Sequence, residues 1–237
     1  TYDNKLFGKK LVVAKYEDQV VNFAELLEMV ALIAPDLRVR FSTSHPKDMT
    51  DDVLHVMAKH HNICKYIHLP VQSGNSRILD MMNRIYSREW YLQRIQAIRN
   101  IVPEAAISTD IISSFCTETE EEHRDTLSLM QEVKYEMAYM FAYNERPGTV
   151  AAKKYTDDIP EEVKKRRLQE IVDLHRIHSL ERNKEDIGKT CEILVEGTSA
   201  RNENDLYVRN SQNKVIVFNR NNFKPGDYAN VKVTGCT

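Results

Sequence analysis

The sequence predicts an α/β fold in which a partial (β/α) barrel is followed by a small antiparallel β-barrel of the OB-like type. Over residues 1–150, short apolar runs alternate with longer segments whose apolar residues recur at helical spacing. This is the pattern of βαβ units in a parallel sheet. After residue 188, strand-like runs alternate with turns rich in Asn, Ser and Gly, as in small antiparallel barrels. We therefore expect two domains, residues 1–187 and residues 188–237.

The strands and helices of the first domain follow from local residue patterns. Strands are expected where apolar and β-branched residues run together or alternate with polar ones, at residues 11–14, 38–42, 65–69, 106–112 and 137–143. Helices are expected where apolar residues fall on one side of a helical repeat, at residues 23–34, 51–59, 76–82, 88–100 and 119–134. Five strands cannot close an eight-stranded barrel, so the barrel should be open or partial.

Capping residues and charges mark where helices begin and end. Thr119 should open a helix whose first turn carries three glutamates, where negative charge is favourable. A long charged helix should then run from Pro160 to about residue 186, with Gly188 at its end. Its basic run at residues 164–167 is either a solvated helix face or an RNA-facing patch.

The second domain should contain strands at residues 191–197, 214–218 and 228–234. Small barrels of this kind often bind single-stranded nucleic acid on one face. The candidate phosphate contacts are Arg201, Arg209, Lys214, Arg220 and Lys224, and the candidate base-stacking residues are Tyr207 and Phe223. Acidic residues make the domain nearly neutral, so a packing or adaptor barrel is the alternative.

Composition limits the classes of function. The formal net charge is -2 and apolar residues make up 42% of the chain, so a core is expected but no whole-chain attraction for nucleic acid. No signal peptide and no membrane-spanning run is found, so no membrane partner is expected. The four cysteines lie far apart without metal-binding spacing, which predicts no metal site and suits the reducing cytoplasm. The chain lacks an initiator Met, and we expect it to be a fragment.

Polar residues gather where the predicted parallel strands end. Ligands of such sheets bind at the carboxyl ends of the strands. The turn after residues 65–69 is the most informative, because it places Gln72 and Ser73 at such an end. The alternative is a plain loop in which Asn75 or Ser76 caps the next helix. The other polar residues at strand ends are Thr43, Ser44, His45, Asp110, Ser113, Tyr143, Asn144 and Arg146.

Two of these residues have structural alternatives. His45 precedes Pro46, and it either contributes to a ligand site or caps a turn. Arg146 precedes a Pro-Gly pair, and it either meets a phosphate or carboxylate with its planar guanidinium or forms a structural ion pair.

Several sequence blocks, taken together, resemble one family. The blocks are Ser-Thr-Ser-His-Pro-Lys-Asp-Met at 42–49, His-Leu-Pro-Val-Gln-Ser-Gly at 68–74 with Met-Asn-Arg at 82–84, Ser-Thr-Asp-Ile-Ile at 108–112 with Glu-Thr-Glu-Glu at 118–121, and Glu-Arg-Pro-Gly-Thr at 145–149. They resemble the radical SAM methylthiotransferases, and the terminal domain is similar to the TRAM domain of that family. The resemblance covers nearly the whole chain in order.

This resemblance implies a radical SAM-type barrel and an enzyme that needs cofactors for a difficult C–H step. Such an enzyme uses S-adenosyl-L-methionine, two [4Fe-4S] clusters and an electron donor protein to methylthiolate isopentenyladenosine in the tRNA anticodon stem-loop. It implies that Gln72, Ser73 and Asp110 hold S-adenosylmethionine or orient the substrate, with Ser44 and His45 as further candidates. Arg146 and the basic residues of the terminal domain are then expected to contact RNA.

The chain also departs from the family pattern. Both groups of cluster-binding cysteines are missing, so the chain alone is expected to be inactive and the ligands to lie upstream. Ser114 stands where the family usually has Gly, Arg209 alone remains of a usual Gly-Arg-Thr, and residues 8–10 replace a usual Gly-Gln-Asn. Two alternatives remain: a methylthiotransferase for threonylcarbamoyl-adenosine in tRNA or for a ribosomal protein aspartate, and a non-catalytic RNA-binding module.

Overall fold

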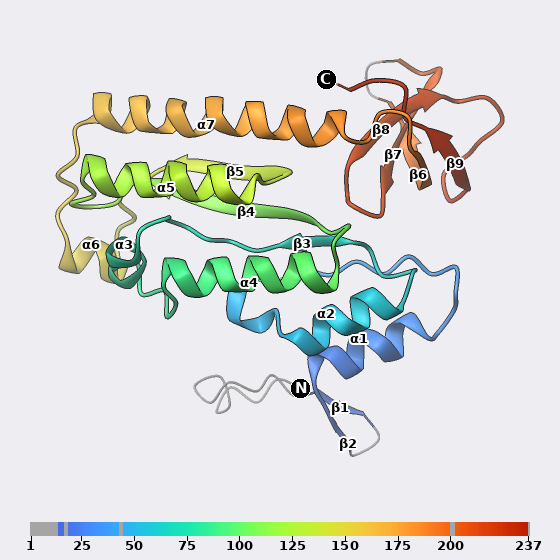
Figure 1. Ribbon diagram of the computed structural model, residues 1–237, viewed down its shortest axis with the longest axis horizontal. Coiled ribbons are helices and arrows are strands. Elements are labelled where there is room, and N and C mark those ends of the chain that lie inside the picture. Colours follow the sequence, from blue (N-terminus) through green and yellow to red (C-terminus); the bar gives the residue numbers. More distant parts are fainter. Residues whose placement is uncertain (1–13, 17–18, 43–44, 200–201, 237) are drawn as a thin grey trace.

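The computed structural model describes residues 14–16, 19–42, 45–199 and 202–236 (Figure 1). An α/β part is joined to an antiparallel part by a long helix. The α/β part contains β1 (Ala14–Tyr16), β2 (Gln19–Val21), α1 (Phe23–Ala31), the short 3-10 helix η1 (Pro46–Asp48), α2 (Asp51–Lys59), β3 (Tyr66–His68), α3 (Ser76–Met81), α4 (Arg88–Ile101), β4 (Ala106–Ser113), α5 (Glu120–Val133), β5 (Met137–Ala142), α6 (Val150–Lys154) and α7 (Glu161–Lys184).

The parallel sheet has the strand order β3-β4-β5. In its register, His68 lies opposite Ser108 and Asp110 lies opposite Tyr139. The predicted strand at 11–14 lies mostly outside the described residues. The prediction of a strand at 38–42 is wrong, because only Val39 makes a parallel bridge, to Ile63.

The reason is visible on either side of Val39. The guanidinium groups of Arg38 and Arg40 bind glutamates of the antiparallel part instead of flanking a continuous strand. The bridge still keeps this segment parallel to the chain that enters β3, because the Val39 N–H donates to the Asn62 carbonyl at 2.9 Å. The sheet is therefore an open partial barrel with a frayed first edge.

One face of the sheet is covered by α4 and α5, and the core lies there. Ile67, Ile107 and Ile111 from the strands are fully buried against apolar residues of these helices. The hydroxyl of Tyr91 on α4 donates to the Leu69 carbonyl at 2.8 Å, and the hydroxyl of Tyr135, just after α5, donates to Tyr91 at 3.0 Å. These bonds satisfy two phenols inside an otherwise apolar layer.

Most helix limits agree with the predicted ones. Helix α2 covers residues 51–59 as predicted, and Thr119 caps α5 in a capping box with the side chain of Glu122. Asn75, one of the two predicted residues, caps α3. The long helix α7 ends at Lys184, two residues earlier than expected, and the sequence pattern did not predict α6.

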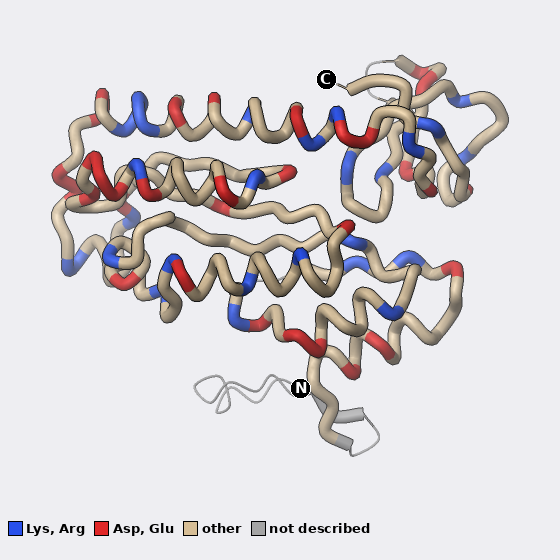
Figure 2. The backbone as a smooth tube through the Cα atoms, viewed as in Figure 1, with Lys and Arg blue, Asp and Glu red and all other residues tan. Residues whose placement is uncertain are grey.

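The basic run of α7 is divided, because Lys165 and Arg166 lie on an exposed helix face. Lys164 and Arg167 are buried. The Lys164 ammonium lies 2.6 Å from the Asp157 carboxylate, and Arg167 pairs with Glu118 at 3.3 Å. Figure 2 shows both acidic and basic residues along α7. Half of the run therefore holds the helix onto the α/β part.

The antiparallel part is a curled four-stranded half-barrel with the strand order β8-β7-β6-β9. Its strands are β6 (Thr190–Thr198), β7 (Asp205–Asn210), β8 (Val215–Asn219) and β9 (Tyr228–Lys232). Ile193, Val195, Leu206 and Val208 form its buried core. Strand β7 was not predicted; in it, buried Leu206 and Val208 alternate with half-buried Asp205, Tyr207 and Arg209.

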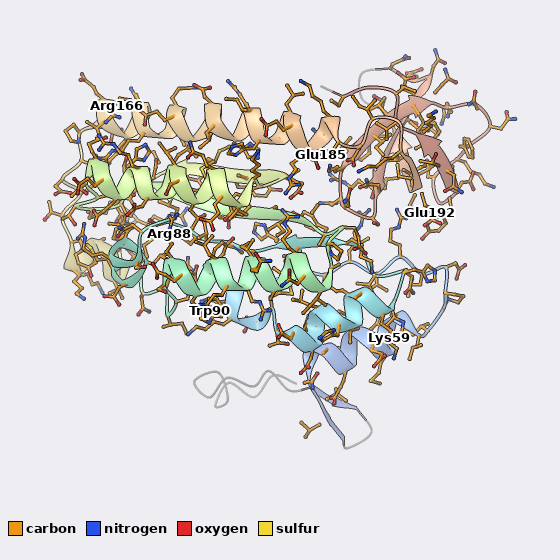
Figure 3. The ribbon with its side chains drawn as sticks, viewed as in Figure 1. Lys59, Arg88, Trp90, Arg166, Glu185 and Glu192 are labelled. Carbon is orange, nitrogen blue, oxygen red and sulfur yellow. The ribbon has the colours of Figure 1, made fainter. Side chains whose placement is uncertain are left out.

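The half-barrel lies at the amino-terminal ends of the parallel strands. Gln212 donates to the Glu104 carbonyl at 2.6 Å, two residues before β4. Arg38 binds the Arg209 carbonyl at 2.9 Å and the carboxylate of Glu192, which projects from the half-barrel (Figure 3). The Lys214 ammonium pairs with Asp186 at 2.5 Å, just after α7. Helices α3 and α6 lie at the opposite end of the sheet (Figure 1).

Candidate functional site

The second face of the parallel sheet is lined by polar and aromatic side chains. Tyr66 and His68 of β3, Ser108 and Asp110 of β4, and Tyr139 of β5 alternate with the buried apolar residues of the same strands. The Tyr139 side chain is 48% exposed. Parallel sheets are normally covered on both faces, so this open polar face is the best candidate for a ligand site in the α/β part.

The side chains on this face are linked to one another. The Tyr66 hydroxyl lies 2.6 Å from the Ser108 hydroxyl, and Nδ1 of His68 lies 2.8 Å from the same oxygen. Nε2 of His68 faces the Asp110 carboxylate at 3.5 Å. The rings of His68 and Tyr139 meet edge to face at 5.9 Å. The group forms one connected arrangement that ends in a carboxylate.

The structure brings Gln72 and Asp110 together at the carboxyl end of the sheet. The Gln72 N–H donates to the Asp110 carbonyl, and the Gln72 carbonyl accepts from Ile112, each at 2.9 Å. Gln72 has φ +70°, a left-handed conformation that is costly for a residue with a side chain and is often found at functional sites. Both residues are buried, Gln72 with 6% of its surface exposed and Ser73 fully, and the Ser73 hydroxyl accepts from the Asn75 N–H at 3.2 Å.

The turn that carries Gln72 is anchored to α4 and α5. Gly74 donates its N–H to the Thr126 hydroxyl at 2.9 Å. A Cβ on Gly74 would lie 2.6 Å from the Asp125 carbonyl oxygen, so only glycine fits there. Arg88 reaches from α4 (Figure 3) and donates to the carbonyls of Gly74, at 3.0 Å, and Asp125, at 2.5 Å. The strand-end residues are thus held on a rigid support.

His45 takes the turn-capping position that was one of its two predicted roles. Its Nδ1 accepts from the Lys47 N–H at 3.2 Å at the start of η1. Its ring packs edge to face on Tyr86 at 5.4 Å, and burial lowers the pKa of the imidazole. The Tyr86 hydroxyl in turn donates to the Pro70 carbonyl at 3.0 Å. Ser44 lies outside the described residues, and a ligand role for either residue stays a prediction.

Arg146 lies beyond the carboxyl end of β5, in a loop that turns at Gly148 with φ +86°. The Thr149 hydroxyl donates to the Arg146 carbonyl at 2.8 Å and also caps α6. The Arg146 side chain is exposed, and within the described ranges it makes no hydrogen bond or ion pair. The predicted structural ion pair is therefore not formed there, and the guanidinium is available at the ligand edge.

The basic residues of the half-barrel divide into engaged and exposed ones. Lys214 is held by Asp186 and the Arg182 carbonyl. Arg209 donates to the Asn213 carbonyl at 3.0 Å and lies over the Tyr207 ring. Arg220 and Lys224 are exposed, whereas Arg201 lies outside the described residues. The Phe223 ring packs against Phe218 in the half-barrel core, with ring centroids 5.8 Å apart. It therefore does not form an open surface on which a base could stack.

The turn between β4 and α5 contains features that the sequence reasoning missed. Ser114 and Thr117 have φ +60° and +61°, and the Ser114 N–H donates to the Glu118 carboxylate at 2.6 Å. Burial raises the pKa of Glu118 to about 7, although Arg167 lies beside it. The sequence held one signal for this left-handed backbone: Ser114 stands where the resembled family usually has glycine, the residue that adopts positive φ most easily.

Tyr66, His68 and Ser108 were also missed as site residues. The sequence signal was present, because polar residues occupy alternate positions of two predicted strands, and alternate positions share one face of a sheet. The strands were predicted from their apolar residues alone, so the alternating polar residues were not assigned to a common face. Asp110, which was predicted, lies on the same face two residues after Ser108.

The cysteines do not form a metal site in the described part of the chain. Cys64 and Cys116 are buried, Cys191 and Cys236 are half-buried, and all four are free thiols. No group of three or more His, Cys, Asp or Glu side chains that could hold a metal occurs among the described residues. An iron–sulfur cluster requires several convergent thiolates, so these residues do not fit one.

The helices that the structure describes include none long and apolar enough to cross a membrane.

Family models match both parts of the chain. The Radical SAM superfamily model matches residues 12–130, and the TRAM domain model matches residues 184–237. The second match covers the half-barrel and begins at the last residue of α7.

Curated relatives match over nearly all of this chain. A protein of Amoebophilus asiaticus named tRNA-2-methylthio-N(6)-dimethylallyladenosine synthase is 61% identical over 93% of this chain and 46% of its own length. Proteins with the same name from Flavobacterium johnsoniae and Phocaeicola vulgatus are 56% and 55% identical, each over 92% of this chain and over 45% and 48% of their own lengths. The chain spans about half the length of these relatives.

A solved structure shares the fold of about two thirds of this chain. Coproporphyrinogen III oxidase from Escherichia coli, described as a radical SAM enzyme, superimposes with a TM-score of 0.53 at 20% identity. The match covers 67% of this chain and 38% of that protein.

Proposed function

The chain belongs to the radical SAM superfamily, and on that premise we propose that it forms the ligand-binding sheet and RNA-binding module of a tRNA methylthiotransferase. The reaction is methylthiolation of N6-isopentenyladenosine next to the anticodon. The observation that carries this proposal is 61% identity, over 93% of the chain, to a relative named as a tRNA-2-methylthio-N(6)-dimethylallyladenosine synthase. The free cysteines suit the reducing cytoplasm, where we expect the protein to act.

Within this function, the open face of the sheet binds an adenosyl group, either of S-adenosylmethionine or of the substrate nucleoside. The Asp110 carboxylate can accept hydrogen bonds from ribose hydroxyls or an amino group. Gln72 lies beside it on the adjoining chain, and the exposed rings of Tyr139 and Phe141 can pack on a base. Ser73 supports the turn from within, and Ser44 and His45 remain candidates on the preceding loop.

RNA binding uses cations at both ends of the molecule. Arg146, exposed at the ligand edge, is suited to a phosphate of the anticodon stem-loop. Of the candidate phosphate contacts in the half-barrel, Arg220 and Lys224 are exposed and are the better ones; Arg220 donates to the Thr198 hydroxyl at 3.3 Å. Lys214 and Arg209 would have to exchange their internal partners for RNA, so we assign them a structural role first.

The two [4Fe-4S] clusters and the electron donor protein of such an enzyme are not assigned to residues of this chain. Its cysteines are scattered and partly buried, so they do not fit a cluster. The role proposed for this chain is accordingly limited to binding and orienting the adenosyl ligand and the RNA.

The proposal is tested by deleting the gene that encodes this chain and analysing tRNA nucleosides and ribosomal proteins by mass spectrometry. We expect the 2-methylthio mark to disappear from isopentenyladenosine and to return with the unaltered gene. An Asp110→Ala gene should fail to restore it, whereas a Lys165→Ala gene, altered at an exposed α7 residue, should restore it.

Other outcomes would favour the alternative functions. Loss of the mark from threonylcarbamoyl-adenosine or from a ribosomal protein aspartate, with isopentenyladenosine unaltered, would contradict the proposed substrate. Unchanged marks together with tRNA binding by the purified chain would favour a non-catalytic RNA-binding module.

A further inference from the structure

Four side chains on the open face form a line that leads to the Asp110 carboxylate. The line runs from the Tyr66 hydroxyl to the Ser108 hydroxyl at 2.6 Å, then to Nδ1 of His68 at 2.8 Å. Nε2 of His68 then faces Oδ1 of Asp110 at 3.5 Å. Ser108 is fully buried, and the His68 side chain is 17% exposed, so solvent competes little within the line.

The carboxylate fixes the direction in which this line donates protons. A neutral imidazole has one N–H donor and one bare acceptor nitrogen. If the proton were on Nδ1, the lone pair of Nε2 would face the negative charge of Asp110, which is repulsive. With the proton on Nε2, the N–H group of His68 faces the Asp110 charge at 3.5 Å, which is an attractive contact. Nδ1 then accepts the single hydroxyl proton of Ser108, and Ser108 accepts from Tyr66.

We propose that His68 is a positioning residue, which Ser108 and Tyr66 hold as the Nε2–H tautomer so that it orients the Asp110 carboxylate toward an adenosyl ligand. His68 occupies one side of the carboxylate, while the Asp110 side chain remains 31% exposed. The edge-to-face contact with Tyr139 restrains the imidazole from a second side. The choice of an adenosyl ligand rests on the proposed function, whereas the tautomer rests on geometry alone.

The tautomer is measured on the whole chain by two-bond ¹⁵N–¹H correlation spectra of ¹⁵N-histidine-labelled protein. The His68→Gln variant assigns the His68 signals among the 8 histidines. At a pH where His68 is neutral, we expect Nε2 to carry the proton. Tyr66→Phe should keep this tautomer, because the Ser108 hydroxyl still donates to Nδ1. Ser108→Ala removes that donor and should raise the share of the Nδ1–H form, while the Asp110 charge keeps Nε2–H the major form. A proton on Nδ1 in the unaltered chain would overturn the inference.

The positioning role is measured by calorimetric titration with S-adenosylmethionine. Ser108→Ala should weaken binding by about tenfold, the effect of one well-placed hydrogen bond, although Asp110 is unaltered. The matched control is Ser179→Ala, a serine of α7 whose hydroxyl donates to the Glu136 carbonyl at 3.2 Å; it should bind as the unaltered chain does. Equal affinity in Ser108→Ala and the control would overturn the positioning role.

Failure of the proposed function would look different. If the unaltered chain did not bind S-adenosylmethionine, the adenosyl assignment would be contradicted, and the tautomer spectra would still decide whether Ser108 holds His68 against Asp110. Far-ultraviolet circular dichroism of each variant separates these outcomes from misfolding, because loss of α4 and α5 would remove much of the helical signal.

Discussion

Replacing Ser114 with glycine should raise the free energy of unfolding of the α/β part. Ser114 has φ +60°, and a left-handed conformation costs an L-residue roughly 1–2 kcal/mol. Its buried hydroxyl has no hydrogen-bond partner among the described residues, which costs about 1 kcal/mol or more. Glycine gives back about 0.4–1 kcal/mol through the greater freedom of the unfolded chain. The net expectation is a stabilisation of about 2 kcal/mol.

Urea denaturation followed by the fluorescence of Trp90 measures this effect. Trp90 is the single tryptophan and lies on α4 (Figure 3), so it reports on the α/β part. Ser114→Ala removes the hydroxyl but keeps the Cβ, so it should give about half of the gain. Ser113→Gly is the matched control: Ser113 lies in β4 with an ordinary backbone, and glycine there should destabilise by about 1 kcal/mol. A Ser114→Gly protein no more stable than the unaltered chain would refute the reasoning.

Three further changes test other parts of the structure. Gly74→Ala should lower the free energy of unfolding by about 3 kcal/mol or more, because its Cβ would enter the α5 backbone; the same fluorescence assay measures it. Burial raises the pKa of Glu118 to about 7 from 4.5, so the folded state holds this proton more tightly than the unfolded chain. The contribution of Glu118 to the free energy of unfolding should therefore be largest below pH 4.5. It should fall by up to about 3 kcal/mol as the pH rises through about 7. Glu118→Gln should abolish that part of the pH dependence in denaturation curves. Lys214→Met should free the half-barrel from Asp186 and speed limited proteolysis after α7, whereas Lys224→Met, at an exposed residue, should leave the cleavage rate unchanged.

The parts of the fold that were predicted from sequence are those with strong local signals. Helix α5 was predicted because Thr119 followed by glutamates is a typical helix start. In the structure, Thr119 and Glu122 form the capping box at that position. Strand β7 was missed although buried Leu206 and Val208 alternate with half-buried residues, because the Asn and Ser residues around it were interpreted as a turn and Arg209 as an RNA contact. The segment around Val39 failed as a strand because its neighbours bind a partner more than 150 residues away, which no local pattern contains.

The candidate site was predicted where it depends on strand ends and missed where it depends on strand faces. Asp110 and Gln72 follow from the rule that ligands bind at the carboxyl ends of parallel strands, and the ladder between their backbones joins them. The rule does not say which polar residues face outward. Ser73 was predicted by the same rule, yet it is fully buried, and Gln72 is only 6% exposed.

The position of the half-barrel at the amino-terminal ends of the strands sets a distance. Strand β4 has 8 residues, and at about 3.3 Å per residue it separates the two ends of the sheet by about 25 Å. That length is several times the rise of about 3.4 Å per nucleotide along one strand of a DNA duplex, so it spans several nucleotides. An RNA bound by Arg220 and Lys224 would therefore present to Asp110 a nucleotide far from the bound phosphates. The length of the rigid sheet would set this distance, so the choice of nucleotide would depend on its distance along the RNA as well as on the identity of its base.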